Sequence, residues 1–143
     1  MIKKILYTVG QIALFVAIYF AFDAWQTRNL LADVPAPEFE LVSTDNQLFK
    51  LSELPAQKTV LYFFAPWCKI CHMSIGNLEE LRQSVAEDKL TIVVIALDWQ
   101  STEEIIKYKK DHGLTMPVLL GSEKTMKDYK IQAFPTYYIL DKN

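Results

Sequence analysis

The only two cysteines of this 143-residue chain, Cys68 and Cys71, are separated by two residues. Thiols at this spacing lie within one turn of a helix, where they can form a reversible disulfide. The thiolate is the nucleophile in disulfide exchange, and a helix amino terminus favours it through unpaired N–H groups and the positive end of the helix dipole. The pair therefore predicts dithiol–disulfide exchange, with Cys68 as the accessible, low-pKa thiol and Cys71 as the buried one.

The segments on either side of the pair predict a strand that leads into it and a helix that begins there. Residues 59–65 form an apolar run rich in β-branched and aromatic side chains, typical of a buried strand. Residues 70–86 carry apolar side chains at helical spacing, which predicts an amphipathic helix. Its expected buried face consists of Cys71, Ile75, Leu78, Leu81 and Val85.

The rest of the chain alternates between expected strands and helices. Predicted strands cover residues 38–43, 47–51, 90–97, 117–120 and 136–140, and further helices cover 101–112 and 123–129. The first two strands form a hairpin around residues 44–46, and Ser101 and Gly113 are the expected caps of the 101–112 helix. This alternation predicts an α/β fold with a layered sheet.

Two motifs of the chain resemble those of a known superfamily. Residues 64–71, Phe-Ala-Pro-Trp-Cys-Lys-Ile-Cys, resemble the active-site segment of the thioredoxin superfamily, and Phe134-Pro135-Thr136 resembles its cis-proline loop. Residues 35–54 and 112–120 resemble the amino-terminal extension and central insertion of the membrane-anchored TlpA/ResA-like thiol-disulfide oxidoreductases. The resemblance covers residues 35–143. It implies a thioredoxin-like fold, with a central mixed sheet flanked by helices and an amino-terminal β-hairpin.

The same resemblance implies roles for individual residues. Cys68 and Cys71 are the expected catalytic, redox-active pair, with no metal and no cofactor. Substrate binding is expected at Trp67, beside the nucleophile, and at Phe134, Pro135 and Thr136, where a cis Phe134–Pro135 bond would lie against the sulfurs. The expected reaction is reduction of disulfides in extracytoplasmic partner proteins, with a membrane thiol reductant as electron donor. The net charge of −2 gives no reason to expect a nucleic-acid partner.

Two positions depart from the superfamily pattern. A buried acid often precedes the first cysteine by six residues, but Tyr62 stands there, and Ser74 stands where ResA-like members often have glutamate. No carboxylate is therefore expected beside Cys71. Lys69, between the cysteines, is expected to lower the pKa of Cys68 further, and His72 is expected at the surface or as a modulator of the thiolate.

Other functions fit parts of this pattern. A non-catalytic redox sensor or client-binding module could use the same pair. Cys68-Lys69-Ile70-Cys71-His72 also matches the c-type haem attachment pattern, with Met73, Met116, Met126 or His112 as the second axial ligand. A zinc site would need Cys68, Cys71, His72 and His112, whose spacing matches no zinc motif, and two unreactive cysteines are the remaining alternative.

The amino terminus predicts a membrane anchor. After Lys3 and Lys4, residues 5–25 are almost entirely apolar and long enough to span about 30 Å, the hydrocarbon core of a bilayer. A cleaved signal peptide and a buried helix are the alternatives. The expected organisation is a transmembrane signal anchor (1–25), a linker (26–36) and a thioredoxin-like domain (37–143) outside the bacterial inner membrane, facing the periplasm or its equivalent.

The carboxyl terminus ends where the resembling fold would continue. Residues 141–143 follow the last expected strand, and the family fold adds a return strand and a helix. The domain is therefore expected to be carboxyl-terminally incomplete, with Tyr137 and Ile139 lacking a covering layer on an edge strand.

Overall fold

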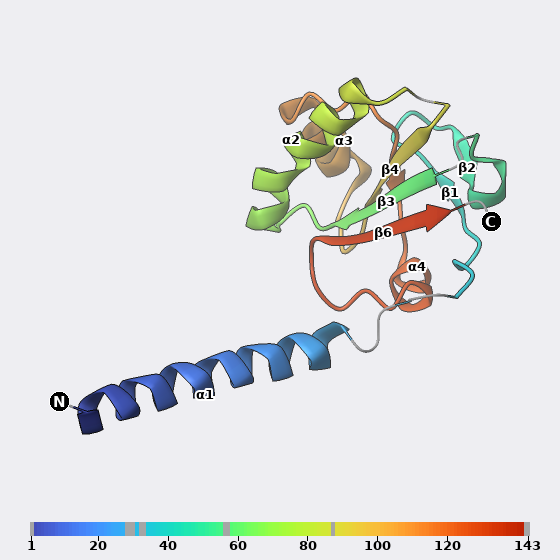
Figure 1. Ribbon diagram of the computed structural model, residues 1–143. Coiled ribbons are helices and arrows are strands. Elements are labelled where there is room, and N and C mark those ends of the chain that lie inside the picture. Colours follow the sequence, from blue (N-terminus) through green and yellow to red (C-terminus); the bar gives the residue numbers. More distant parts are fainter. Residues whose placement is uncertain (1, 28–30, 32–33, 56–57, 87, 142–143) are drawn as a thin grey trace. The chain divides into compact units, whose positions relative to one another are not determined.

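A computed structural model of the chain describes residues 2–27, 31, 34–55, 58–86 and 88–141 (Figure 1). The chain divides into two compact units, Met1–Ala32 and Asp33–Asn143. The helices are α1 (Ile2–Thr27), α2 (Lys69–Ser84), α3 (Thr102–Asp111) and α4 (Glu123–Asp128), with a 3-10 turn at Leu51–Glu53. The strands are β1 (Glu40–Val42), β2 (Leu48–Lys50), β3 (Lys58–Phe64), β4 (Leu90–Ala96), β5 (Val118–Leu120) and β6 (Thr136–Asp141).

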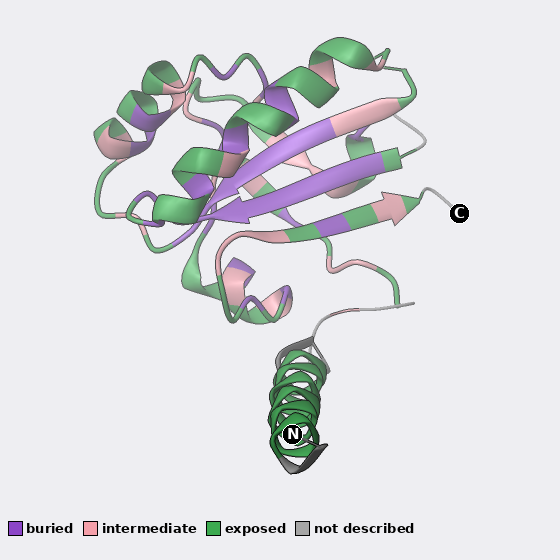
Figure 2. Ribbon diagram, turned by 60° about the vertical axis from the view of Figure 1, so that its left-hand side comes forward, coloured by how far each residue is buried: buried purple, intermediate pink, exposed green. Residues whose placement is uncertain are grey.

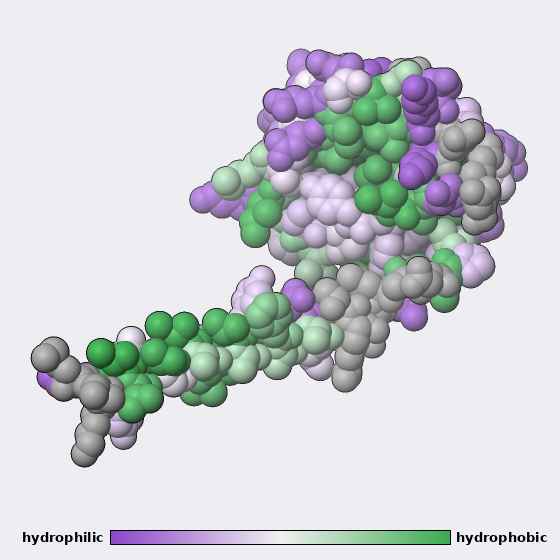
Figure 3. All heavy atoms as spheres, viewed as in Figure 1, coloured by the Kyte–Doolittle hydropathy of each residue, from purple (hydrophilic) through white to green (hydrophobic). Residues whose placement is uncertain are grey.

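The first unit consists of the long apolar helix that the sequence predicts. Helix α1 ends two residues beyond the expected boundary at residue 25. Its stretch from Lys4 to Trp25 is long and apolar enough to cross a membrane, and none of this stretch is buried. Figure 3 shows apolar side chains along the middle of this helix, with polar side chains near its ends. The ability of α1 to cross a membrane rests on its length and composition, and an amino-terminal signal sequence would meet the same criteria.

The second unit is built on a mixed four-stranded sheet with the order β5-β4-β3-β6. Strands β3, β4 and β5 run parallel, and β6 runs antiparallel to β3. Helices α2 and α3 cover one face of the sheet, and α4 lies on the opposite side (Figure 1). Strand β6 is an edge strand, as expected, and Ile139 on it is 75% exposed. This arrangement is the α/β thioredoxin-like fold that the sequence predicts.

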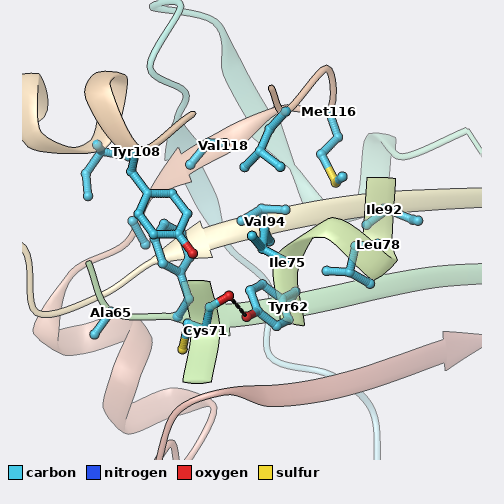
Figure 4. Close-up of a cluster of buried hydrophobic side chains, with 14 of the residues drawn as sticks. Tyr62, Ala65, Cys71, Ile75, Leu78, Ile92, Val94, Tyr108, Met116 and Val118 are labelled. Carbon is cyan, nitrogen blue, oxygen red and sulfur yellow. Dashed lines mark hydrogen bonds between the residues drawn. The ribbon is translucent and has the colours of Figure 1, made fainter. Parts of the chain in front are cut away.

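The central strand β3 supplies the core on both faces of the sheet (Figure 2). Tyr62 and Phe64 point to the side of α2 and α3, where they join a cluster with Cys71, Ile75 and Tyr108 (Figure 4). Phe63 points to the other side, with its ring centroid 4.9 Å from that of Tyr129 and 6.0 Å from that of Tyr138. Continuous hydrophobicity in β3 therefore reflects burial on both faces, as the apolar run predicted.

The predicted amino-terminal hairpin is present and is joined to the sheet. Strands β1 and β2 pair antiparallel, with Glu40 opposite Lys50. Asn46 adopts a φ of 58° in the connecting turn, a conformation that asparagine tolerates better than most residues. The N–H of Thr44 donates to the Val118 carbonyl at 2.9 Å, which ties the hairpin to β5.

Two expectations about the helix after the cysteines are wrong. Helix α2 ends at Ser84, so Val85, which was expected on its buried face, is the C-cap residue and is only half-buried. Leu81 is 37% exposed, whereas Glu79 is buried. The cause is a long-range contact, because the carboxylate of Glu79 accepts hydrogen bonds from the N–H and hydroxyl of Thr115, at 3.0 and 2.7 Å. The segment before β5 therefore packs on the Glu79 side of the helix, away from Leu81.

Candidate active site

The two cysteines lie at the predicted junction between β3 and α2. Cys68 is the N-cap residue of α2, with φ −76° and ψ 104°, and its N–H donates to the Ala65 carbonyl at 3.0 Å. The N–H of Cys71 donates to Sγ of Cys68 at 3.2 Å. A sulfur in this position takes the place of the oxygen of an ordinary N-cap side chain, and negative charge on it is stabilised by the helix amino terminus.

The two sulfurs form a disulfide, with the Cα atoms 5.2 Å apart. Cys71 is fully buried, whereas Cys68 keeps 6% of its surface exposed. Exchange with an external thiol requires access to a sulfur. The difference in exposure therefore favours Cys68 as the sulfur that meets a partner.

A tyrosine and a serine replace the carboxylates that the resemblance would place near Cys71. The hydroxyl of Tyr62 lies 3.1 Å from Oγ of Ser74 and 3.5 Å from the carbonyl oxygen of Cys71 (Figure 4). Burial raises the pKa of Tyr62 to about 12, although the hydrogen bond with Ser74 acts against this shift. Tyr62 therefore remains protonated at neutral pH and holds the first turn of α2 in place, and it does not act as a base there.

Trp67 forms an exposed aromatic contact next to the disulfide. Its side chain is 64% exposed, and its Nε1–H donates to Oδ2 of Asp98 at 2.9 Å. The Trp67 ring packs edge-to-face with Phe134, with centroids 5.8 Å apart. Trp67 and Phe134, which were both expected to bind substrate, are thus in direct contact.

The expected cis bond between Phe134 and Pro135 is present. Thr136, the first residue of β6, pairs with Phe63 near the end of β3, so the proline loop ends beside the segment that leads to Cys68. The hydroxyl of Thr136 donates to the Ala133 carbonyl at 2.8 Å, which closes this loop on itself. The structure therefore brings the proline loop to the same edge of the sheet as the cysteine segment.

Asp98 was not identified from the sequence. It follows β4 and adopts a φ of 51°, in the left-handed region that few non-glycine residues occupy. The available signal was its place after an apolar strand parallel to β3, because the carboxyl ends of parallel strands meet at one edge of the sheet. Its carboxylate fixes the orientation of Trp67 through the hydrogen bond to Nε1.

Several of the residues considered as alternative haem or zinc ligands are engaged in other contacts, whereas Met73 is 76% exposed. Met116 is buried in the core, and both ring nitrogens of His72 are hydrogen-bonded, one to the Pro66 carbonyl and the other to His112. His72 is exposed, as expected, but it is not an isolated surface residue. Within the part of the chain that the structure describes, no three His, Cys, Asp or Glu side chains group as metal ligands.

Comparison with known proteins agrees with this fold and with this pair. The thioredoxin-like protein YneN of Bacillus subtilis is 28% identical over 149 residues, which cover 99% of this chain and 86% of that protein. The thiol-disulfide oxidoreductase ResA of Oceanobacillus iheyensis is 31% identical over 114 residues. The crystal structure of a thiol:disulfide interchange protein of the thioredoxin family from Chlorobium tepidum superposes with a TM-score of 0.68 at 27% identity, covering 77% of this chain and 81% of that one.

The extent of these matches differs. The alignment with ResA covers 76% of this chain but only 58% of ResA. The model of the AhpC/TSA family matches residues 32–143, which is more than half of the chain. The chain therefore belongs to the AhpC/TSA family of thioredoxin-like proteins, and thiol-disulfide oxidoreductases of the ResA type are its homologues.

Proposed function

We propose that this chain reduces disulfide bonds of extracytoplasmic partner proteins through the Cys68–Cys71 couple. The observation that carries the proposal is the placement of Cys68 at the N-cap of α2, where its Sγ accepts a hydrogen bond from the Cys71 N–H at 3.2 Å. The same contact would stabilise a Cys68 thiolate in the reduced protein. Cys71, fully buried, is accessible to Cys68 but not to a partner.

The reaction has two exchange steps. The Cys68 thiolate attacks one sulfur of the partner disulfide and displaces the other as a thiolate, which leaves a mixed disulfide. Cys71 gives up its thiol proton to the thiolate displaced in the first step, and its sulfur then attacks Sγ of Cys68 and releases the partner sulfur bound there as a thiolate, which takes a proton from solvent. Two electrons pass to the partner, and this chain ends with a Cys68–Cys71 disulfide. A membrane thiol reductant restores the dithiol by the reverse pair of exchanges.

The surface around Cys68 supports docking of another protein. Three large apolar side chains near the cysteines are exposed. Trp67, directly before Cys68, is 64% exposed, and Ile70 and Met73, in the first turns of α2, are 63% and 76% exposed. Apolar side chains gathered at a reactive residue are typical of a protein-binding surface. Phe134, Pro135 and Thr136 would complete it, with the loop backbone pairing with an extended segment of the partner.

Reduction of insulin disulfides by dithiothreitol tests the proposal. The detergent-solubilised chain should accelerate the reaction with many turnovers, whereas a redox sensor would exchange only one equivalent of electrons. Cys68→Ser should abolish the acceleration. Cys71→Ser should retain the first step and accumulate a mixed disulfide through Cys68. Equal acceleration by the Cys68→Ser variant and the unmodified chain would overturn the proposal.

A further inference from the structure

The only two histidines of the chain lie against each other, and one of them directly follows Cys71. His72, which directly follows Cys71 on α2, has its Nδ1 3.1 Å from Nε2 of His112. The ring centroids are 4.9 Å apart. His112 is the C-cap residue of α3, a position for which the sequence predicted Gly113. The contact therefore joins the active-site helix to the carboxyl end of α3.

The outer nitrogen of each ring faces a backbone carbonyl. Nε2 of His72 lies 2.7 Å from the carbonyl oxygen of Pro66, and Nδ1 of His112 lies 2.9 Å from the carbonyl oxygen of Tyr108. A carbonyl oxygen accepts hydrogen bonds and cannot donate one. Both outer nitrogens must therefore carry hydrogen.

This arrangement determines how many protons the pair holds. If each ring has only its outer hydrogen, both inner nitrogens present lone pairs to each other at 3.1 Å, with no hydrogen between them. If both inner nitrogens are protonated, two N–H groups face each other. Only one additional proton completes all three hydrogen bonds. The geometry thus corresponds to a pair of imidazoles that shares three protons and carries one positive charge.

The surroundings of the pair favour that charge. The ring of Tyr108 lies 4.7 Å from His72 and 4.2 Å from His112, close enough for a cation–π interaction. His112 lies at the carboxyl end of α3, where the helix dipole favours a cation.

The charged residues on the neighbouring segments include two lysines, which oppose a positive charge, and one aspartate. Lys69 precedes His72 by almost one turn of α2, and Lys110 is close to His112 on α3. Asp98 lies on the loop after β4 and is hydrogen-bonded to Trp67. The positive charge on the pair is thus favoured by the hydrogen bonds, the ring of Tyr108 and the carboxyl end of α3, and it is opposed by repulsion from the two lysines.

We propose that His72 and His112 hold one proton as a unit, and that the resulting positive charge promotes the thiolate of Cys68. The link is structural as well as electrostatic, because the Nε2–H of His72 holds the Pro66 carbonyl two residues before Cys68. The proposal rests on the proposed function only for the reduction of the Cys68–Cys71 disulfide. When a thiol reductant supplies two electrons and one proton goes to Cys71, Cys68 is left as a thiolate whose charge the pair offsets. Both histidines are positioning residues, since they act through Cys68.

Nitrogen-15 NMR of the histidine rings tests the proton count. Because the chain has only two histidines, selective labelling of the oxidised, detergent-solubilised chain reports on this pair alone. Over a distinct interval of pH, three protons should be shared among the four ring nitrogens. The third and the fourth proton should be taken up in two separate steps, because the inner nitrogens share a single hydrogen. Two independent titrations in one interval would overturn the pairing, whether or not the chain is a reductase.

Alkylation of reduced Cys68 by iodoacetamide, followed from pH 5 to 9, tests the effect on the thiolate. The glutamine of His112→Gln can still donate to Nδ1 of His72 but carries no charge. This variant should alkylate about threefold more slowly near neutral pH, which corresponds to a displacement of the rate–pH profile by about half a pH unit. His112→Lys, with a charge that does not titrate in this range, should restore the rate and remove the pair's inflection from the profile.

A matched control separates this effect from general surface charge. Lys110→Gln removes one positive charge from the same end of α3, at an exposed position, and should change the rate by less than about 1.5-fold. His72→Gln should match His112→Gln, and the double variant should be no slower than either one, because the pair acts as a unit. Equal rates for Lys110→Gln and His112→Gln, or additive losses for the two histidines, would overturn the proposal.

Discussion

At the scale of single residues, the site is held by polar contacts between segments distant in the sequence. Asp98 orients Trp67, His112 contacts His72, and Thr115 binds Glu79. Each contact joins the cysteine segment or α2 to the region after β4. Hydrogen bonds to charged groups contribute more than neutral ones, so these contacts limit how far α2 and its N-cap cysteine can move.

Glu79 is the buried member of this set, and its removal should destabilise the fold. Glu79→Ala leaves the N–H and hydroxyl of Thr115 without their acceptor, at an expected cost of about 1–3 kcal/mol in the free energy of unfolding. The exposed neighbour Glu80 provides a matched control, because Glu80→Ala should change the free energy of unfolding by less than about 0.5 kcal/mol. Urea denaturation of the detergent-solubilised variants at pH 7 measures both values. Equal midpoints for the two variants would contradict this role.

The contribution of Glu79 should also depend on pH. Burial acts to raise the pKa of Glu79, but the hydrogen bonds from Thr115 outweigh it, and the pKa is lowered. A carboxyl whose folded-state pKa is below its unfolded value stabilises the fold above that unfolded value, about 4.3, and loses the contribution as pH falls through the folded-state pKa. The difference between the unmodified chain and Glu79→Ala should therefore shrink between pH 5 and pH 3.

At the scale of elements, local patterns predicted most of the fold and the centre of the site. The apolar runs of β3 and β4, the serine at the start of α3 and the turn of the hairpin have short-range causes, and the structure contains all of them. The resemblance at Phe134-Pro135 predicted the cis bond. The partner of His72 and the burial of Glu79 were not predictable, because each depends on how α2 packs against residues 36 or more positions away.

Two glycines differ in their surroundings, which gives a prediction about packing between elements. A Cβ on Gly121, after β5, would lie 2.9 Å from the Ala96 carbonyl oxygen and 2.6 Å from Cδ2 of Leu97, whereas Gly76 on α2 has nothing within 4 Å. Gly121→Ala should therefore cost about 1–3 kcal/mol in the free energy of unfolding. Gly76→Ala should add about 0.5–1 kcal/mol, because alanine is the better helix former.

Thermal unfolding followed by near-ultraviolet circular dichroism measures both substitutions. Because each replaces glycine by alanine, the change in side chain is the same and only its location differs. Stabilisation by Gly121→Ala would show that β5 and the end of β4 are not packed as closely as the distances indicate.

At the scale of the whole molecule, the chain combines an exposed apolar helix with a unit that carries the Cys68–Cys71 disulfide. Exposed apolar surface of this extent is unfavourable in water and favourable in a bilayer. Disulfide chemistry is common outside the cytoplasm, where thiols are not kept reduced by the cytoplasmic systems. Both features support the proposal of an anchor at residues 1–25 with the thioredoxin-like unit on the extracytoplasmic side.

Reporter fusions after Asn143 test this orientation. Lys3 and Lys4 precede the apolar stretch, and the positive-inside rule keeps such residues in the cytoplasm, so the carboxyl end should lie outside. Alkaline phosphatase fused there should be active, because it needs export to form its own disulfides, and a green fluorescent reporter that does not fold after export should stay dark. Recovery in the membrane fraction after a carbonate wash should distinguish an uncleaved anchor from a cleaved signal peptide. An inactive phosphatase together with a fluorescent reporter would refute the orientation, and it would place Cys68–Cys71 in a compartment where the proposed partners are absent.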